Sequence, residues 1–306
     1  MTAIIFHRID LDGWFSCAIA MKYYNAIDKP FKLFPYHYGD PIPDTSDCSD
    51  IVMLDVSFKR RDMLKLIHDH ERVLLIDHHI SAIKDLSDLM DEFANFRIYG
   101  NDIYSACEHA WRHFFPLHPI PMSVLLVGAY DSFRHRKMNI DAIADIVYDS
   151  EESQESFVLK CQYGFRTWIT NQDEALNHLI TMPENTQYQT GNHVYRYLWN
   201  EARTIYNSGY EIVIHEHLSI GRDILPRRFK VINRERFNPI NFGIDYHNEG
   251  YDGIVSCYFD GTVWNVSIYN DNNQIDCSAI AKRFGGGGHK GAAGCRIANL
   301  ESLSIR

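Results

Sequence analysis

Short apolar runs alternate with helix-like segments along the first third of the chain. The apolar runs predict buried strands at 2–6, 31–36, 51–54 and 72–76. Segments 14–25 and 59–70 have apolar residues at helical spacing. Strands that alternate with helices are typical of βαβ units, so this pattern predicts a parallel sheet covered by helices.

Helical patterns dominate the middle of the chain. They cover 81–93, 103–115, 140–180 and 194–208, with a short strand expected at 96–99 and a polar connection at 182–192. Gly209 is the expected stop of the last helix.

From residue 210 the pattern changes to short strands, at 211–215 and 229–232. Asp260-Gly261 separates two further apolar runs and predicts a hairpin with a two-residue turn. Segment 276–284 reads as a short helix that Asp276 caps. We therefore expect an α/β protein with three parts: an N-terminal parallel-sheet domain at 1–185, a helical linker at 186–209 and a smaller mixed α/β domain at 210–306.

Side chains that can bind metals follow the predicted strands directly. The three strand ends carry His7, Asp10 and Asp12, then Asp55, then Asp77, His78 and His79. A further acid, Asp131, follows the apolar run 125–130. Any one acid reads equally well as a loop residue or a helix cap. Parallel strand ends meet at one sheet edge, where α/β proteins bind ligands, so the repetition favours one common site.

The residue types indicate a site for two divalent metal ions. Such a pair needs a bridging ligand and several carboxylates and imidazoles. Oxygen and imidazole ligands without sulfur suit manganese, with magnesium or cobalt as alternatives. A metal pair of this kind clamps a phosphate oxygen and generates a nucleophile from water, which is the chemistry of phosphoester hydrolysis.

Composition narrows the classes of partner. The chain has 306 residues and a net charge of −10, which argues against tight binding to long duplex DNA. No apolar stretch approaches the ~20 residues that span a bilayer, so no membrane partner is expected. The seven cysteines are scattered and form no CxxC pair, which predicts reduced thiols in a cytoplasmic protein.

Four glycines at 285–288 precede His289 and Lys290. Glycines allow backbone N–H groups to approach an anion closely, and the two side chains add donors. A flexible loop is the alternative interpretation. A Walker A phosphate loop is excluded, because no GK[ST] follows.

These motifs together resemble the DHH-family phosphoesterases, over nearly the whole chain. The resemblance is strongest to the nanoRNase or oligoribonuclease type with a DHH-associated C-terminal domain. The motifs are HRIDLDG at 7–13, LDVS at 54–57, DHH at 77–79, GAYDSF at 128–133, and CSAIAKRF at 277–284 followed by GGGGH.

The resemblance implies a role for each motif residue. One metal would be held by His7, Asp10 and Asp55. The other would be held by Asp12, Asp55, His78 and Asp131, so that Asp55 bridges. His79 would face the scissile phosphate, and His79 and Asp55 would be the catalytic residues. Asp77 would orient the histidines.

The C-terminal motif implies a substrate site. The residues that would hold a terminal phosphate or nucleotide are Arg283, Gly286, Gly287, Gly288, His289 and Lys290. Tyr269 stands where related enzymes often have an arginine, so a phosphate contact is lost or replaced by base stacking. His7 and Asp10 are also one residue further apart than in some relatives, a difference that the loop between them is expected to absorb.

The implied activity is metal-dependent phosphodiester hydrolysis of short single-stranded oligonucleotides or dinucleotides, which releases 5′-mononucleotides. Two other substrates stay open: 3′-phosphoadenosine phosphate for a phosphatase, or a cyclic or linearised cyclic dinucleotide. A nucleotide-binding protein that has lost catalysis is the non-enzyme alternative, and the complete set of ligand types argues against it. The sequence leaves open the length of the substrate, the preference for RNA or DNA, and the oligomeric state, for which a homodimer is one alternative.

Overall fold

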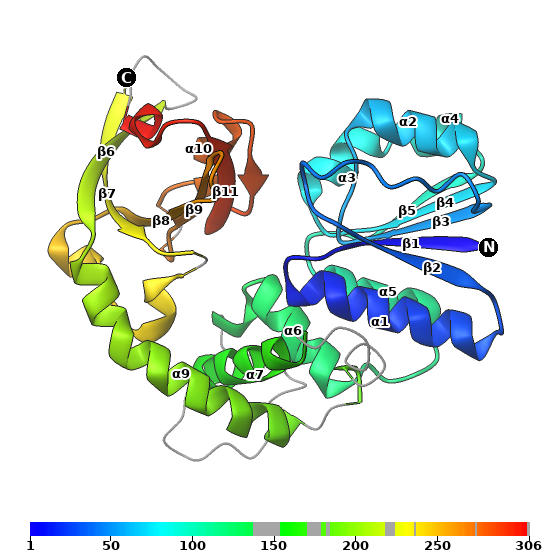
Figure 1. The fold of residues 1–306 in the computed structure, drawn as a ribbon, viewed down its shortest axis with the longest axis horizontal. Coiled ribbons are helices and arrows are strands. Elements are labelled where there is room, and N and C mark those ends of the chain that lie inside the picture. The colour runs from blue at the N-terminus through cyan, green and yellow to red at the C-terminus, as the bar shows by residue number, and fades with distance from the viewer. Residues whose placement is uncertain are drawn as a thin grey trace. The chain divides into compact units, whose positions relative to one another are not determined.

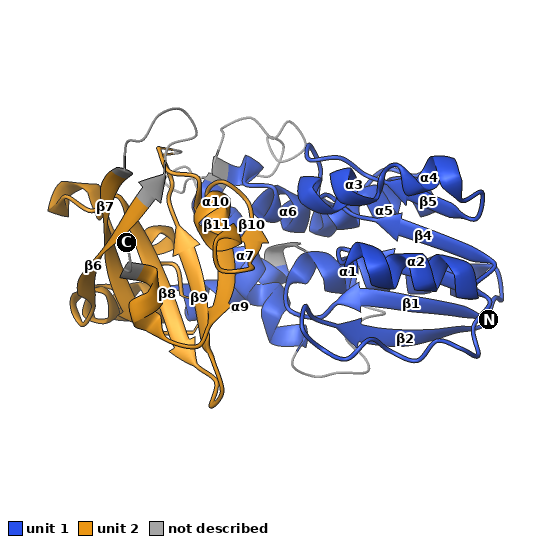
Figure 2. Cartoon of the chain, turned by 90° about the horizontal axis from the view of Figure 1, so that it is seen from above, with its two compact units in different colours: residues 1–195 blue, residues 196–306 orange. Residues whose placement is uncertain are grey.

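The computed structural model describes residues 1–136, 154–169, 179–181, 184–217, 224–235, 237–272 and 274–304. It divides into two compact units, Met1–Tyr195 and Arg196–Arg306 (Figure 2). The boundary lies inside one long helix, α9 (Glu184–Asn207). The polar connection expected at 182–192 is therefore wrong from residue 184 onward, because that segment is the first part of α9.

The first unit contains a five-stranded parallel sheet, which confirms the predicted α/β fold. The strand order is β2-β1-β3-β4-β5. The strands are β1 (Thr2–His7), β2 (Phe31–Tyr36), β3 (Asp50–Leu54), β4 (Arg72–Ile76) and β5 (Phe96–Tyr99). Because β1, β3 and β4 are adjacent and parallel, the residues that follow them lie at one edge of the sheet.

Helices cover both faces of this sheet (Figure 1). One face carries α1 (Leu11–Ala26) and α5 (Ala106–Phe114). Helices α6 (Met122–Asp131) and α7 (Gln154–Ile169) pack against these helices and join the same core. The other carries α2 (Arg60–Asp69), α3 (Ile80–Leu86) and α4 (Leu89–Glu92). Successive side chains of a strand point to opposite faces. Ile4 and Phe6 accordingly join the first core, while Ala3 and Ile5 join the second.

Two helix predictions in this unit need correction, and the apolar run before Asp131 is assigned to an element. Segment 81–93 is two short helices rather than one. The helix expected from 103 begins at Ala106, because Ser105 and Glu108 form a capping box there. The apolar run before Asp131 is helix α6, and Asp131 is its last residue. Of the helical segment expected at 140–180, the structure describes α7 and residues 179–180, and the other residues of the segment lie outside the described ranges.

The second unit is built on a six-stranded mixed sheet of order β10-β11-β9-β8-β7-β6. Its strands are β6 (Tyr210–His217), β7 (Ile224–Asn233), β8 (Gly253–Phe259), β9 (Trp264–Tyr269), β10 (Gly287–Gly288) and β11 (Ala292–Ile297). Helix α10 (Cys277–Lys282) contributes Ile280 and Ala281 to its core, and Asp276 caps the helix as expected. The described residues also form four 3-10 helices, η1 (Arg134–Arg136), η2 (Pro239–Phe242), η3 (His247–Glu249) and η4 (Leu300–Ser304).

Two turn predictions in this unit are refined. The β8–β9 hairpin is present, but four residues rather than two separate its strands, and Gly261 supplies the positive φ of 97°. The glycine run is part of a small hairpin and not a free loop, since Gly287 and Gly288 pair with Gly294 and Ala293. All seven cysteines are buried, and none forms a disulfide bond. Among the described residues, no helix has the length and apolarity needed to cross a membrane.

Candidate metal centre

The polar residues that follow β1, β3 and β4 meet at the carboxyl edge of the parallel sheet. Asp55 follows β3, and Asp77 follows β4. Both are buried, with exposed fractions of 1% and 0%. Asp12 lies in the first turn of α1 and is equally buried, at 1%. Buried carboxylates are costly unless hydrogen bonds or cations compensate them, so their gathering here marks a specialised site.

Asp55 lies between two groups of potential ligands. Its Oδ2 atom is 3.4 Å from Nδ1 of His7, which in turn is 2.8 Å from Oδ2 of Asp10. Its Oδ1 atom is 3.4 Å from Nε2 of His78 and 3.8 Å from Nδ1 of His79. One carboxylate therefore offers one oxygen to each group, which is the arrangement that a bridging ligand requires.

The second group is completed from α1 and α6. Nε2 of His78 is 3.1 Å from Oδ2 of Asp131 and 3.7 Å from Oδ2 of Asp12. The ligand atoms of Asp12, His78 and Asp131 all lie within 4.8 Å of one another, and those of His7, Asp10 and Asp55 do so as well. The structure thus brings together all six residues that the sequence assigns to metal binding.

Asp55 has an unusual backbone. Its φ of 57° places it in the left-handed region, which residues other than glycine visit rarely. Its N–H donates to the carbonyl oxygen of Ile76 at 2.9 Å, so the β4 strand holds it in this conformation. Asp is among the residues that tolerate the left-handed region best, and such backbone strain is concentrated at functional sites.

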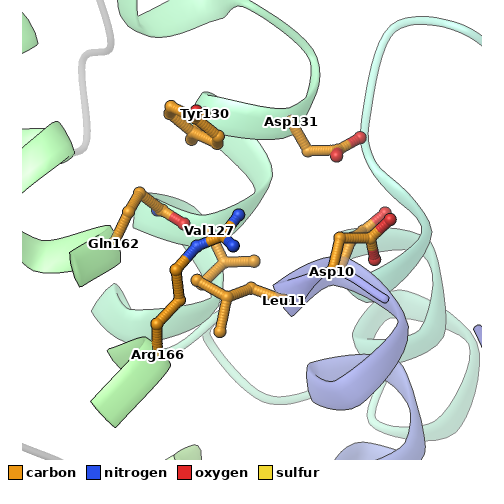
Figure 3. A pocket seen from close by; sticks show the side chains of 8 residues that line it. Asp10, Leu11, Val127, Tyr130, Asp131, Gln162 and Arg166 are labelled. Atoms are coloured by element: carbon orange, nitrogen blue, oxygen red, sulfur yellow. The ribbon is translucent and has the colours of Figure 1, made fainter. Parts of the chain in front are cut away.

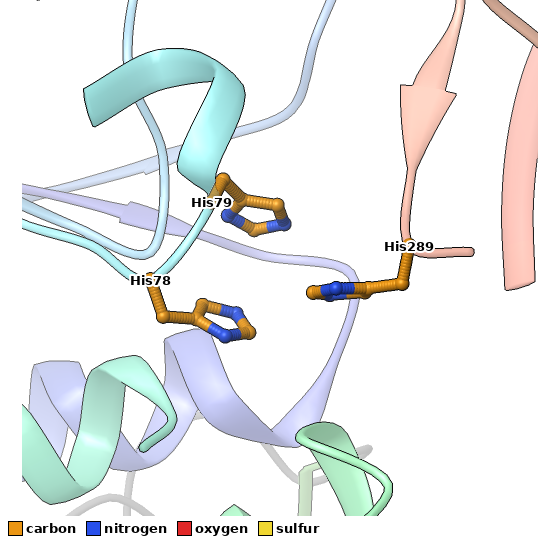
Figure 4. Close-up of side chains that lie close together, drawn as sticks. All are labelled: His78, His79 and His289. Carbon is orange, nitrogen blue, oxygen red and sulfur yellow. The ribbon is translucent and has the colours of Figure 1, made fainter. Parts of the chain in front are cut away.

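Asp77 holds the two histidines that follow it. Its Oδ1 atom accepts from the backbone N–H groups of His78 and His79, at 2.7 and 3.1 Å. The same atom is 2.7 Å from Nδ1 of His79. Figure 4 shows the resulting positions of the two imidazoles, with His79 at the start of α3. These contacts hold the backbone of both histidines and the ring of His79. The orienting role of Asp77 toward metal ligands stays a prediction.

The electrostatics of the cluster favour bound cations. Burial and the charges of Asp55 and Asp131 raise the pKa of Asp12 well above its usual value. Burial and the charge of Asp10 likewise raise the pKa of Asp55. The pKa of His7 rises to about 11, because Asp10 outweighs the opposing effect of burial. Mutual repulsion of buried carboxylates has this signature, and divalent cations relieve it.

Buried polar atoms without a hydrogen bond indicate whether these residues fit metal ions. Within the described residues, Oδ1 of Asp55 and Nδ1 of His7 are buried and have the ion-pair contacts given above, but no hydrogen bond of good geometry. Buried polar atoms are rarely left unpaired without a functional reason. Both atoms face the cluster and both are suitable ligand atoms for manganese or magnesium. The donor set therefore fits two divalent cations.

The sequence interpretation missed residues beside the cluster. Nδ1 of His37 is 3.2 Å from Nε2 of His7, and His37 directly follows β2. The rule that polar residues after apolar runs reach the sheet edge could have found it. A pocket adjoining the cluster is lined by Asp10, Leu11, Asp12, Val127, Tyr130, Asp131, Gln162 and Arg166 (Figure 3). No sequence signal marks Gln162 or Arg166, because α7 lies far from every motif along the chain.

The predicted substrate residues all lie in the second unit. Arg283 follows α10 and donates to the carbonyl oxygen of His215 at 2.6 Å. Tyr269 lies in β9 between Ile254 and Ala292 of the neighbouring strands. The N–H of His289 donates to the carbonyl oxygen of Ala292 at 2.8 Å, which closes the glycine-rich hairpin. The role of these residues toward a substrate stays a prediction.

Comparison with known proteins adds the fold relationship. No family model matches the chain. It is 22% identical to a protein of Acanthamoeba polyphaga mimivirus that is described as uncharacterized, across 97% of this chain and 68% of that protein.

Solved structures of similar fold include RecJ from Thermus thermophilus in complex with Mn²⁺, with a TM-score of 0.54 and 13% identity, covering 99% of this chain and 50% of that one. An exopolyphosphatase-related protein from Bacteroides fragilis has a TM-score of 0.51 and 14% identity, covering 99% and 88%. At such identities the likeness concerns the fold alone. The chain therefore shares the fold of these two structures, and its own sheets are a five-stranded parallel sheet and a separate mixed sheet.

Proposed function

We propose that this protein is a metal-dependent phosphodiesterase that hydrolyses short oligonucleotides or dinucleotides to 5′-mononucleotides. The observation that supports this most directly is the position of Asp55. Its Oδ2 faces His7 and its Oδ1 faces His78, so one carboxylate can join two cation sites. Two adjacent cations suit the in-line displacement of a phosphodiester.

In this proposal each residue has a defined task. Divalent ions would supply Lewis acidity toward the phosphate oxygens and a nucleophile derived from water. Asp77 accepts from Nδ1 of His79 and, against the effect of burial, raises the pKa of this imidazole to about 9. The protonated ring therefore keeps an N–H at Nε2, which can donate a hydrogen bond to the phosphate or to the leaving oxygen. Asp12 and Asp131 fix the position of His78 from the other side. We assign manganese as the metal, with magnesium and cobalt to be compared.

We further propose that the glycine-rich hairpin of the second unit binds the terminal phosphate or nucleotide of the substrate. Gly287 supports this role, because a Cβ placed there would meet no heavy atom within 4 Å. The backbone at that point is open to a ligand. The net charge of −10 favours a small substrate over a long duplex, whose binding depends on many basic contacts.

The test is hydrolysis of a substrate panel by wild type and by Asp55→Ala, with each metal in turn. The panel contains a dinucleotide, a five-nucleotide RNA, a twenty-four-nucleotide strand, a cyclic dinucleotide and 3′-phosphoadenosine phosphate. Asp69→Ala is the matched control, because Asp69 is an exposed acid at the end of α2. We expect cleavage of the two shortest RNAs, abolished in Asp55→Ala and retained in Asp69→Ala.

Other outcomes change the proposal in defined ways. Turnover of only the bisphosphate or the cyclic compound would keep the metal chemistry and replace the substrate. Binding of nucleotides without metal-dependent turnover would overturn the enzyme assignment in favour of a nucleotide-binding protein.

A further inference from the structure

Two polar side chains of α7 face the pocket that adjoins the metal cluster. Gln162 and Arg166 are four residues apart, so they lie on the same side of the helix. Figure 3 shows them on one side of the pocket, with Asp10 and Asp131 on the other. The proposed metal ligands and these two residues therefore line a single hollow.

Gln162 has a buried acceptor without a partner. The side chain is 2% exposed, and its Nε2 donates to the carbonyl oxygen of Leu126 at 2.9 Å. A carbonyl oxygen accepts only from a donor, so this bond determines which end of the amide is the oxygen. The remaining atom, Oε1, is buried and makes no hydrogen bond within the described residues. Such an acceptor requires an N–H or O–H group from elsewhere.

Arg166 is the cation of this pocket. Its side chain is exposed, and no hydrogen bond or ion pair holds it within the part of the chain that the structure describes. The guanidinium group binds phosphate through two parallel N–H donors, a geometry that lysine cannot reproduce. Leu11 and Val127 supply apolar surface beneath it.

We propose that this small pocket and the surface beside it form a subsite for the phosphate and one polar group of the nucleotide next to the scissile bond. Arg166 binds a phosphate that is not cleaved, which leaves the nucleotide at the other end of the substrate to the glycine-rich hairpin. Oε1 of Gln162 accepts a hydrogen bond from a hydroxyl or amino group of the nucleotide whose phosphate Arg166 binds. The inference rests on the proposed function, since the metal cluster defines which phosphate is cleaved. The inference assigns a role in substrate discrimination to α7, a helix that contains none of the sequence motifs described above.

The first experiment compares diadenosine monophosphate with its 5′-phosphorylated form. We expect Arg166→Gln to raise KM about tenfold or more for the phosphorylated form, the loss typical of a charged hydrogen bond, and to leave the KM of the other form unchanged. Arg166→Lys should recover part of the loss. Arg61→Gln makes the same charge change on exposed α2 and should have no effect. Equal KM values for Arg166→Gln and wild type would overturn the phosphate contact.

Equilibrium binding separates this inference from the catalytic proposal. Calorimetry with a 5′-phosphorylated dinucleotide, whose scissile bridging oxygen is replaced by a methylene group, measures affinity without turnover. Weaker binding to Arg166→Gln supports the subsite even when the wild type proves inactive. If the wild type hydrolyses dinucleotides and Arg166→Gln binds the analogue as tightly as wild type, the function stands and the subsite fails. If the analogue does not bind to the wild type, the proposed subsite is overturned.

A second set of substrates identifies the group that Gln162 accepts. The wild type is compared on the phosphorylated diadenosine, its 2′-deoxy form and its inosine form, which replaces the exocyclic amine by an oxygen. We expect one of these two changes to lower kcat/KM about tenfold in the wild type and to have no effect in Gln162→Met. Thermal unfolding of Gln162→Met checks that the lost bond to Leu126 has not unfolded the unit. If neither the 2′-deoxy form nor the inosine form lowers the kcat/KM of the wild type, the role of Gln162 is overturned.

Discussion

The carboxylate of Asp12 accepts a hydrogen bond from the backbone N–H of Ala106, 94 residues further along the chain. Its other oxygen accepts from the backbone N–H of Cys107, and both hydrogen bonds are 2.8 Å long. The first N–H groups of a helix have no partner within it, so Asp12 caps α5 from another element. The same carboxylate approaches His78, and the first turn of α5 therefore determines how Asp12 faces the metal cluster.

Replacing Asp12 should weaken the fold as well as metal binding. Asp12→Ala leaves two buried N–H groups of α5 without an acceptor, while it relieves repulsion between Asp12 and Asp55. We expect a net loss of about 1–2 kcal/mol in the free energy of unfolding, as for other helix caps. Urea unfolding in the presence of a chelator measures this without the metal. A change no larger than that of Asp69→Ala would contradict the capping role.

Manganese should stabilise the folded protein through Asp55. The buried carboxylates repel one another, and a cation that binds only the folded state adds about 2.7 kcal/mol when its concentration is 100 times Kd. We expect the thermal midpoint to rise with manganese and to return with a chelator. In Asp55→Asn the thermal midpoint should no longer rise with manganese, and the protein should no longer bind two ions. Calorimetric titration gives the stoichiometry, and Asp69→Asn should behave as the wild type.

His37 should act on the metal through His7. Nδ1 of His7 faces Asp10 and Asp55, so Nε2 carries the proton when Nδ1 binds a cation, and this proton is donated to Nδ1 of His37. Loss of such a partner typically costs about 10- to 100-fold in metal affinity, and we expect this for His37→Ala. Competition with a chromophoric chelator measures it. His118→Ala removes an exposed imidazole as a control, and equal affinities of the two variants would exclude the role.

The glycine-rich hairpin separates structural from functional glycines. A Cβ on Gly286 would lie 2.0 Å from the carbonyl oxygen of Gly294, whereas a Cβ on Gly287 would meet nothing within 4 Å. Gly286→Ala should therefore destabilise the protein by about 1–3 kcal/mol, the usual cost of overpacking. Gly287→Ala should change stability by less than about 0.5 kcal/mol.

Substrate binding then distinguishes the two variants further. If the backbone of Gly287 approaches the substrate, Gly287→Ala should weaken nucleotide binding while its unfolding curve stays at the wild-type position. Wild-type nucleotide affinity in Gly287→Ala would contradict the proposed role of the hairpin. Chemical unfolding and nucleotide titration of the same preparations provide both readouts.

The strands and the residues of the metal cluster could be predicted from the sequence, because the patterns that indicate them are local. A strand buried on both faces reads as an apolar run, and β1, β3 and β4 place His7, Asp55 and Asp77 directly after such runs. Parallel pairing then requires these ends to meet at one edge. The turn lengths and the helix boundaries at 81–93 and 182–192 were less accessible, because caps and packing determine them.

The amino-acid sequence by itself determined the α/β class, the parallel sheet and the residue types at its edge. Only the tertiary structure decided which oxygen of Asp55 faces which histidine, that Asp12 caps α5, and that Gln162 and Arg166 reach the same pocket as Asp10. The reason is physical. Local patterns record whether a segment is buried, whereas contacts between distant residues depend on how the helices pack across the sheet.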